Sequence, residues 1–507
     1  MEETGGIVVV NSNLAFNLKE TDAISVRDTD TPLKWCSVSL SEVISAGKRI
    51  DATTFDMELK HAKSVLEKLD VECLPVSGEK GFCNAYRPGI CKRIFVEKSD
   101  DSIEMLTPSQ ITEIYPKAEK YLSANMTDYI SNWFVKKGEI LLTCSGTIGN
   151  LSYVSNTLDG KCVSQNLIRL VPKDNTTAGY IYAFLKSKFG QLFLTRNNYG
   201  AVIQHIDPEH LEQVLIPDAH REIKGKIHNL IIRSFELRDE SNVLFEQATK
   251  LLIEELNLPP VNEFEQDNIK NPTRINAFNV NLSKLNGRVD ASYHLPIVDA
   301  IIAHLKENAA EVTTIGDERV SSNVILPGRF KRIYVDEGYG RIFIGGKQLG
   351  ELDPSNKKYL SLIHHGERIT QQLELHENMT LITCSGTIGK VTMVGKQWEN
   401  WTANQHIIRI VPANEDIAGY INIFFYLFCC SPDMDVKKDL APRTSHTVRT
   451  FFSGKAYFRP TAWANSENVS FFLAFLFGCK RGSEERRDLP FDIQIRAVFG
   501  LPFWYVS

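Results

Sequence analysis

The sequence predicts an α+β protein in which two tandem domains of mixed α/β structure are separated by a long coiled-coil-type helix. Three observations lead to this prediction. The heptapeptide Thr-Cys-Ser-Gly-Thr-Ile-Gly occurs at Thr143–Gly149 and again, 240 residues later (383 minus 143), at Thr383–Gly389. Short runs typical of strands and helices surround both copies. A proline-free stretch with heptad spacing, His220–Leu256, lies between them.

The repeat extends well beyond the heptapeptide. Three further pairs of segments have nearly the same spacing: Arg169–Pro172 with Arg409–Pro412, Lys92–Ile94 with Lys331–Ile333, and Lys120–Ser123 with Lys358–Ser361. Solenoid repeats have periods of about 20–50 residues, so a period this long indicates two whole domains. Each copy is large enough to bury a core of its own.

Length and composition are those of a globular protein. The chain has 507 residues, of which 43% are hydrophobic and 23% charged. The net charge of −5 argues against non-specific coating of nucleic acid, although a local basic patch on an acidic protein still allows specific DNA binding. The ten cysteines include no cluster with zinc-ligand spacing, so we expect no metal site and a reducing environment. We see no signal peptide and no apolar run of about 20 residues, and we expect a cytoplasmic protein.

The elements of each copy follow from apolar spacing. Met57–Leu69 carries an apolar stripe at three-to-four spacing and is predicted to be a helix, as is Val298–Asn308 in the second copy. Thr177–Phe189 is a further predicted helix. Strands are predicted at Gly138–Cys144, Leu151–Val154 and Asn166–Leu170, the first two joined by a turn at Ser145-Gly146.

The predicted spacer helix has apolar residues that alternate by four and three along its length, with small residues in the middle layers. Its main seam positions are Ile223, Ile227, Leu230, Leu237, Leu244 and Leu251. About 37 helical residues at ~1.5 Å each would form a rod of roughly 55 Å. Such a seam requires a partner, because it would otherwise expose too much apolar surface. An ordinary helix packed between two domains is the alternative.

The last part of the chain departs from the repeat. After about Leu427 the second copy stops matching the first, and an aromatic- and arginine-rich tail without heptads follows. Two interpretations compete: a different domain, or out-of-frame translation after a frameshift. The abrupt break favours the second, and a heptad helix encoded in another frame downstream of codon 427 would establish it.

Taken together, these residues resemble the specificity (S) subunit of a Type I restriction–modification system, over roughly residues 33–427. The resemblance is carried by the Ser-Gly-Thr-Ile-Gly units (Ser145–Gly149, Ser385–Gly389), the Gln-x-x-Ile-Arg strands (Gln165–Arg169, Gln405–Arg409), and Tyr199–Ile206 before the helix. The family's second long helix, expected after the second recognition domain, has no recognisable counterpart here.

The resemblance implies a domain plan and a function. Residues 1–217 would be the first target-recognition domain, 218–257 the spacer helix, 258–428 the second target-recognition domain and 429–507 the divergent tail. The chain would be a non-catalytic DNA-binding subunit that reads a bipartite site in double-stranded DNA and recruits methyltransferase and, through them, restriction subunits. Any cofactors would belong to those partners, and none to this chain.

Candidate DNA contacts fall into two groups. Basic residues common to both copies suit phosphates, which carry no sequence information; they are Lys92, Arg93, Lys331 and Arg332, with Arg329 beside the second pair. Base readers are expected where the copies differ, as in Ser99–Pro108 against Asp336–Gly346. Gln204 and His205 are further loop candidates. The alternatives are a solvated strand face for the basic pairs and a packed or capping role for His205.

Other motifs indicate scaffolding rather than chemistry. The Ser-Gly-Thr-Ile-Gly loop lacks the lysine of a phosphate-binding P-loop, and a tight turn with a positive φ at Gly146 is favoured. Gln165 and Gln405 would read adenine edges or, as we favour, satisfy backbone groups. No catalytic motif is found. A duplicated α/β enzyme acting on DNA, an interaction scaffold that binds no DNA, and an inactive frameshift product remain as alternatives.

Overall fold

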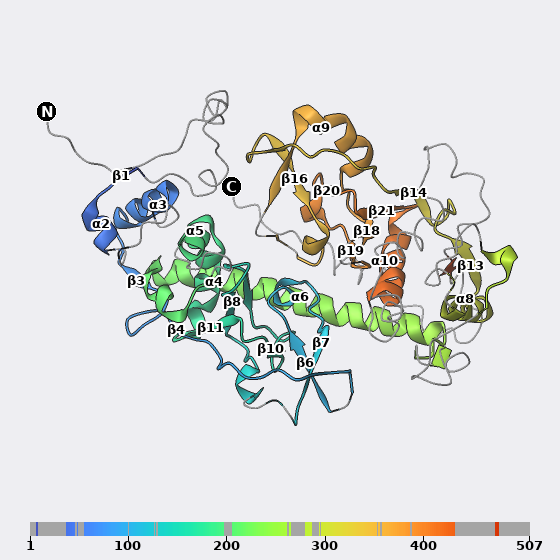
Figure 1. Ribbon diagram of the computed structural model, residues 1–507, viewed down its shortest axis with the longest axis horizontal. Coiled ribbons are helices and arrows are strands. Elements are labelled where there is room, and N and C mark those ends of the chain that lie inside the picture. Colours follow the sequence, from blue (N-terminus) through green and yellow to red (C-terminus); the bar gives the residue numbers. More distant parts are fainter. Residues whose placement is uncertain are drawn as a thin grey trace. The chain divides into compact units, whose positions relative to one another are not determined.

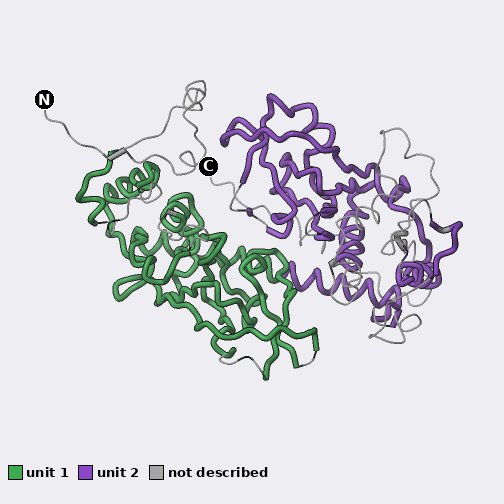
Figure 2. Tube along the Cα trace, viewed as in Figure 1, with its two compact units in different colours: residues 1–239 green, residues 240–507 purple. Residues whose placement is uncertain are grey.

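The computed structural model describes residues 7–8, 37–45, 48, 55–99, 101–125, 127, 130–196, 205–260, 263–264, 279–285, 294, 296–351, 353–354, 357–385, 388–430 and 472–475. The chain divides into two compact units, Met1–Asp239 and Glu240–Ser507 (Figures 1 and 2). Both units contain helices and sheets, which confirms the predicted α+β class. The boundary between the units falls inside the long helix, and the domain limits at residues 217, 257 and 428 stay a prediction.

The first sheet of unit 1 is antiparallel, with the strand order β4-β11-β8-β9. Its strands are β4 (Cys83–Tyr86), β8 (Ile140–Thr143), β9 (Leu151–Tyr153) and β11 (Leu167–Pro172). Every residue of β8 is buried, since its Ile-Leu-Leu-Thr sequence is apolar enough for the centre of a core. The strands predicted around residues 138–144, 151–154 and 166–170 are therefore confirmed.

The second sheet of unit 1 has the order β10-β6-β7-β5. Its strands are β5 (Phe95–Val96), β6 (Ser102–Leu106), β7 (Lys120–Ser123) and β10 (Cys162–Val163). A short pair, β3 (Cys73–Pro75) with β12 (Leu215–Pro217), closes the unit just before the long helix. Another short pair, β1 (Ile7–Val8) with β2 (Ser37–Val38), precedes helix α2 (Leu40–Ser45).

The helices of unit 1 cover the first sheet. Helix α3 (Met57–Glu67) begins at Asp56, whose carboxylate accepts hydrogen bonds from the backbone N–H groups of Glu58 and Leu59 at 2.8 and 3.2 Å. It buries Leu59, Ala62 and Leu66, so the helix predicted from this stripe is confirmed.

The single helix predicted over 177–189 is wrong in one respect, because it is broken into α4 (Ala178–Lys186) and α5 (Lys188–Arg196). Ser187 has an extended backbone, and its hydroxyl donates to the Phe184 carbonyl at 2.6 Å. The corner is tight: a Cβ at Gly190 would lie 2.2 Å from the Phe184 carbonyl oxygen. Glycine therefore permits a helix reversal that apolar spacing does not reveal.

Unit 2 repeats both sheets strand for strand. The first has the order β14-β21-β18-β19, and the second β15-β17-β16-β20. The strands are β14 (Ser321–Ile325), β15 (Tyr334–Val335), β16 (Gly340–Ile344), β17 (Lys358–Ser361), β18 (Thr380–Thr383), β19 (Val391–Met393), β20 (Thr402–Ala403) and β21 (Ile407–Pro412). The shared strand order shows that the repeated sequence segments fold into equivalent sheets.

The helices of unit 2 are only partly repeated. Helix α8 (Pro296–Asn308) contains the predicted helix Val298–Asn308, and α10 (Glu415–Cys430) follows β21. Helix α9 (Leu362–Arg368), continued by a π-helical segment (Ile369–Leu373), connects β17 to β18. Among its described residues, the corresponding connection in unit 1 has a 3-10 turn, Ile130–Trp133, and no α-helix.

Strand β13 (Glu311–Thr314) follows α8 and pairs with β22 (Phe472–Phe475), as β3 pairs with β12 in unit 1. Beyond Cys430 the described residues are those of β22, and the rest of the predicted tail lies outside the described part. The frameshift interpretation thus stays a prediction.

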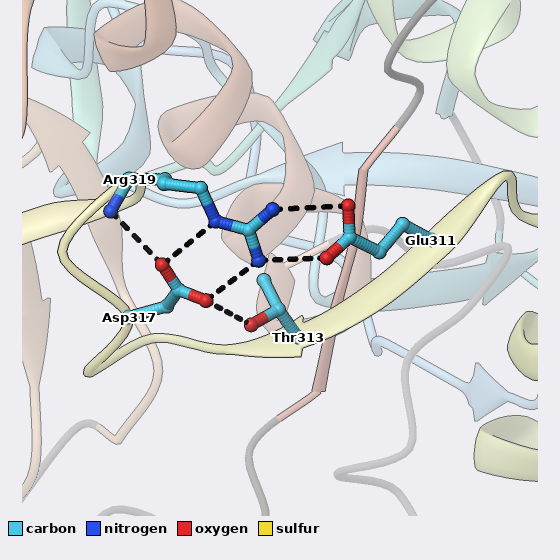
Figure 3. A network of polar contacts seen from close by, with 4 residues as sticks. All are labelled: Glu311, Thr313, Asp317 and Arg319. Atoms are coloured by element: carbon cyan, nitrogen blue, oxygen red, sulfur yellow. Dashed lines mark hydrogen bonds and ion pairs between the residues drawn. The ribbon is translucent and has the colours of Figure 1, made fainter.

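A polar network holds the turn between β13 and β14 (Figure 3). The Arg319 guanidinium donates to both carboxylate oxygens of Glu311, at 2.6 and 3.1 Å, and to those of Asp317, at 2.8 and 3.0 Å. The Thr313 hydroxyl donates to Asp317 at 2.7 Å. These hydrogen bonds, that of Arg319 above all, hold the pKa of the Asp317 carboxyl well below its usual range.

Each first sheet contains a buried arginine at its centre. Arg169 on β11 is 2% exposed, and the equivalent Arg409 on β21 is fully buried. Arg169 donates to the Phe134 carbonyl at 2.8 Å, and Arg409 donates to the carbonyls of Ile407 and Leu373 at 2.8 and 3.3 Å and to that of Ala403. Burial lowers the pKa of Arg409 to about 9, which leaves it charged at neutral pH. The shared arginines are thus structural.

Helix α6 (Arg221–Glu255) is continuous over 35 residues, and the predicted long helix is confirmed (Figure 1). Its residues up to Asp239 belong to unit 1, where Phe235 is buried and Ile227 packs against the core. Its later residues belong to unit 2, where Leu252 is buried. None of the described helices has both the length and the apolar character needed to cross a membrane.

The start of α4 lies against α6 within unit 1. The Gly179 N–H donates to Nδ1 of His228 at 3.1 Å, and a Cβ at residue 179 would lie 2.7 Å from the His228 carbonyl oxygen. This contact requires glycine at 179 and a neutral imidazole at 228, because a protonated Nδ1 cannot accept a hydrogen bond. Burial lowers the pKa of His228 accordingly.

Acidification is expected to weaken this contact. The folded-state pKa of His228 lies below the unfolded value of about 6.5, so the contribution is full above pH ~6.5 and shrinks as the pH falls below it. The effect should stay under about 1 kcal/mol, because solvent reaches part of the imidazole. Urea unfolding at pH 8 and pH 5.5 would measure it, with His228→Asn as the non-titrating control. A wild-type protein that loses no more stability than the variant between these pH values would contradict the assignment.

Candidate nucleic-acid interface

Two exposed cations lie over one exposed aromatic ring on the second sheet of unit 1. The Phe95 side chain on β5 is 49% exposed. The Arg93 guanidinium lies 5.9 Å from its ring centroid, and the Lys120 ammonium, on the adjacent strand β7, lies 5.5 Å from it. Cation–π attraction holds such groups in place while leaving them accessible. We call Lys92, Arg93, Phe95 and Lys120 the unit 1 cluster.

Unit 2 has an equivalent arrangement. The Lys358 ammonium on β17 lies 5.3 Å from the ring centroid of Tyr334 on β15, and the Arg332 guanidinium lies 5.8 Å from that of Phe343. The Tyr334 and Phe343 rings are in contact, with centroids 5.9 Å apart. We call Lys331, Arg332, Tyr334 and Lys358 the unit 2 cluster. Lys120 and Lys358 are equivalent in the repeat, as are Phe95 and Tyr334.

The charges of the two clusters are available to a ligand. Lys92, Arg93, Arg329, Lys331 and Arg332 are all exposed. Among the described residues, no carboxylate forms an ion pair with any of these five or with the two cluster lysines, in contrast to Arg319, which two carboxylates neutralise. Unpaired cations on a strand surface suit the phosphates of a nucleic acid backbone.

Sequence reasoning missed Lys120 and Lys358. Each is separated from its aromatic partner by more than twenty residues of chain, and only the antiparallel pairing of β5 with β7, and of β15 with β17, brings them together. The available signal was that each lysine opens a shared Lys-Tyr-Leu-Ser strand.

The other residues predicted to contact DNA lie outside the two clusters. Gln204 lies outside the described residues. His205 is half-buried, and its backbone bridges to Ser145 at the β8–β9 turn of the first sheet, next to the hydrogen bond from Ile206 N–H to the Cys144 carbonyl at 3.1 Å. Gln405 is only 8% exposed, which favours a structural role over adenine recognition.

The Ser-Gly-Thr-Ile-Gly loop is a tight turn, as predicted. Gly146 and Gly149 have φ values of 77° and 93°, a conformation that favours glycine. The Thr143 hydroxyl accepts the Asn150 N–H at 3.0 Å, and the equivalent Thr383 hydroxyl accepts the Lys390 N–H at 2.9 Å. These contacts are internal to the turn, which favours the tight-turn interpretation over a phosphate cradle. Within the described ranges, no group of three or more His, Cys, Asp or Glu side chains is placed to hold a metal ion.

Part of unit 1 matches a known protein family. Residues 93–230 match the family model described as the Type I restriction modification DNA specificity domain. The matched segment includes Arg93, Lys120 and the first turns of α6. No curated protein is similar enough to count as a relative.

Two solved structures were also found to be similar. The S subunit of a Type-I restriction-modification system from M. genitalium is 12% identical, with 74% of this chain and 89% of that chain covered and a TM-score of 0.19. The HsdS subunit from Thermoanaerobacter tengcongensis is 14% identical, with 71% and 83% covered and a TM-score of 0.21. The informative likeness is that of residues 93–230, which are similar to the Type I restriction modification DNA specificity domain, and the predicted resemblance to the specificity subunits of these systems is confirmed.

Proposed function

We propose that this chain is the non-catalytic, DNA-reading subunit of a Type I restriction–modification complex in the cytoplasm, and that the unit 1 and unit 2 clusters each hold backbone phosphates of one half of a bipartite site. The observation that carries the proposal is the repeated pairing of an unneutralised lysine with an exposed aromatic ring, Lys120 with Phe95 and Lys358 with Tyr334. The first of these pairs lies within the matched specificity domain.

Both units have such a cluster, which supports a role in binding backbone phosphates. Two domains that read different bases still meet the same phosphate backbone, so groups common to both suit the backbone. Phosphate contacts supply affinity that falls with salt, because each neutralised phosphate releases condensed counterions. The overall charge of −5 leaves such local patches responsible for attraction to DNA.

Helix α6 is proposed to set the gap between the half-sites and to recruit the methyltransferase subunits, through which restriction subunits join. Part of its predicted seam is open to a partner, since Ile223 and Leu230 are each 52% exposed and Leu251 is 42% exposed. Exposed leucine and isoleucine at heptad spacing on a long helix are typical of a subunit interface. Cofactors of methylation and cleavage would belong to the partners.

The proposal is tested by removing cations from each cluster. Arg93→Ala with Lys120→Ala, and separately Arg332→Ala with Lys358→Ala, should each weaken binding of the complex to random-sequence duplex DNA. Loss of two phosphate contacts should reduce the slope of log affinity against log salt by about 2, with little change in sequence preference. Titration at several salt concentrations measures this slope.

Lys63→Ala is the matched control, because Lys63 is an exposed lysine on α3 outside both clusters. A slope that falls as much in this control as in the cluster variants would contradict the assignment. The function itself is tested by sequencing the host methylome with and without the gene. Loss of a gapped, two-part methylated motif is expected, and an unchanged set of motifs would exclude an active specificity subunit.

A further inference from the structure

Unit 2 has an open hollow beside its cationic cluster. The hollow has a volume of about 520 Å³ and is lined by three pieces of chain: Tyr334–Asp336 and Tyr339 around the end of β15, Ser361 at the end of β17, and Ile363 and His364 on α9. Tyr334 belongs both to the hollow and to the unit 2 cluster, so the hollow adjoins the ring that holds the Lys358 ammonium at 5.3 Å. A ligand whose phosphates contact Lys358 would therefore meet the hollow next.

The lining combines exposed apolar surface with fixed polar groups. Ile363 is 90% exposed and Tyr339 is 74% exposed, although both are large side chains that a monomer usually covers. Nδ1 of His364 lies 2.9 Å from the Ser361 hydroxyl, which also accepts the His364 N–H at 3.3 Å. The imidazole is thus held at one nitrogen, and no described residue forms a hydrogen bond with the other nitrogen, Nε2.

This chemistry fits a nucleobase. A base has a flat apolar face, which aromatic and aliphatic side chains cover, and a polar edge, which imidazole, carboxylate and phenol groups can contact through hydrogen bonds. Asp336, which also lines the hollow, adds an acceptor. A small anion would not require the exposed Ile363 and Tyr339, and a purely apolar ligand would leave His364 and Asp336 unpaired.

A comparison of the two units shows which residues that line the hollow have equivalents in unit 1 and which do not. Ser361 and Tyr334 have equivalents in unit 1, Ser123 and Phe95, because β17 and β15 correspond to β7 and β5. Helix α9 has no equivalent among the described residues between β7 and β8 of unit 1. The register of β6 with β7 and of β16 with β17 places Asp101 of unit 1 at the position of Tyr339. Features common to both units suit the phosphate backbone, so features confined to one unit suit its own target bases.

We propose that Tyr339, Ile363 and His364 form a specificity-determining subsite of unit 2 that receives the edge and face of a nucleobase in the half-site read by this unit. The proposal rests on the proposed DNA-reading function. Ile363 supplies the apolar contact, as for a thymine methyl group or an opened base step, and Nε2 of His364 supplies the hydrogen bond. Lys358 and Arg332 hold the neighbouring phosphates and set the register.

The test is a triple variant, Tyr339→Ala with Ile363→Ala and His364→Ala, in the full chain assembled with its modification subunits. Selection of bound duplexes from a random-sequence pool reads both half-sites at once. Discrimination should fall by about 5- to 150-fold at one or two base pairs of one half-site, as for loss of a base contact. The other half-site and the salt slope should remain as in the wild type. The exposure of Ile363 and Tyr339 makes a folding defect a poor explanation of this pattern.

The matched control is Lys358→Ala, which should weaken binding to all sequences and keep both half-sites. If the triple variant selects the wild-type motif unchanged, or relaxes both halves alike, the subsite is wrong while the DNA-reading function stands. If the wild-type complex itself selects no gapped motif, the proposed function fails, and the subsite falls with it.

Discussion

Replacing Asp239 by alanine is expected to detach the first half of α6 from unit 1. The Asp239 carboxylate is only 8% exposed and accepts four hydrogen bonds from one loop. They come from the Ser155 hydroxyl at 2.7 Å, the Asn156 N–H at 2.9 Å, and the Thr157 N–H and hydroxyl at 3.1 and 2.6 Å. Hydrogen bonds to a charged group contribute about 1.5–3 kcal/mol each, and the variant also leaves buried donors unpaired.

The loss should total about 3–5 kcal/mol, less than the sum of the bonds because water replaces part of them. Urea unfolding gives the magnitude, and hydrogen exchange at the Asn156 and Thr157 amides gives the location. Glu236→Ala is the matched control on the same helix, since its ion pair with Arg233 is more than half exposed and should contribute little. An Asp239→Ala protein as stable as this control would show that the loop does not hold the helix.

The second large effect is expected from Arg409→Ala in unit 2. The fully buried guanidinium donates to three carbonyls, those of Ile407, Leu373 and Ala403. Alanine would leave these acceptors without partners and open a cavity between β21 and the π-helical segment. Unsatisfied buried acceptors and a large cavity together should cost about 3–5 kcal/mol.

Lysine at this position keeps the charge but lacks the planar fork, so Arg409→Lys should restore only part of the stability. Arg332→Ala removes an exposed arginine from the same unit and should leave unfolding unchanged. Hydrogen exchange should show the Arg409→Ala effect in the amides of β18 and β21. Equal exchange rates in the two alanine variants would contradict a structural role for the buried arginine.

Sequence reasoning succeeded where one pattern determines one element. The buried run Ile140–Thr143, the stripe of α3 and the heptads of α6 each specify their own structure locally, and the repeat transfers the assignment to unit 2. It failed where the structure depends on information that is not local in the sequence. The break at Ser187 depends on how closely Gly190 approaches the preceding turn. Helix α9 lies in a connection whose sequence is not repeated between the units.

In the candidate interface, too, some residues could be predicted from the local sequence and others could not. Arg93 and Arg332 were predicted from a shared basic pair, whereas Lys120 and Lys358 required knowledge of which strands are neighbours. The burial of Arg169 and Arg409 was equally hidden, because a charged residue on a strand normally predicts an exposed face. Most of their carbonyl partners come from other segments: Phe134 for Arg169, and Leu373 and Ala403 for Arg409.

The segment between β17 and β18, which contains α9, bears on how the sequence of such a protein can vary. Both of its ends are fixed, since β17 is hydrogen-bonded within the second sheet and β18 within the first. In unit 1, the described residues between the equivalent strands β7 and β8 include a 3-10 turn in place of an α-helix. Variation can therefore accumulate in this stretch while the sheets keep their register, so a mutation that alters target choice need not endanger folding.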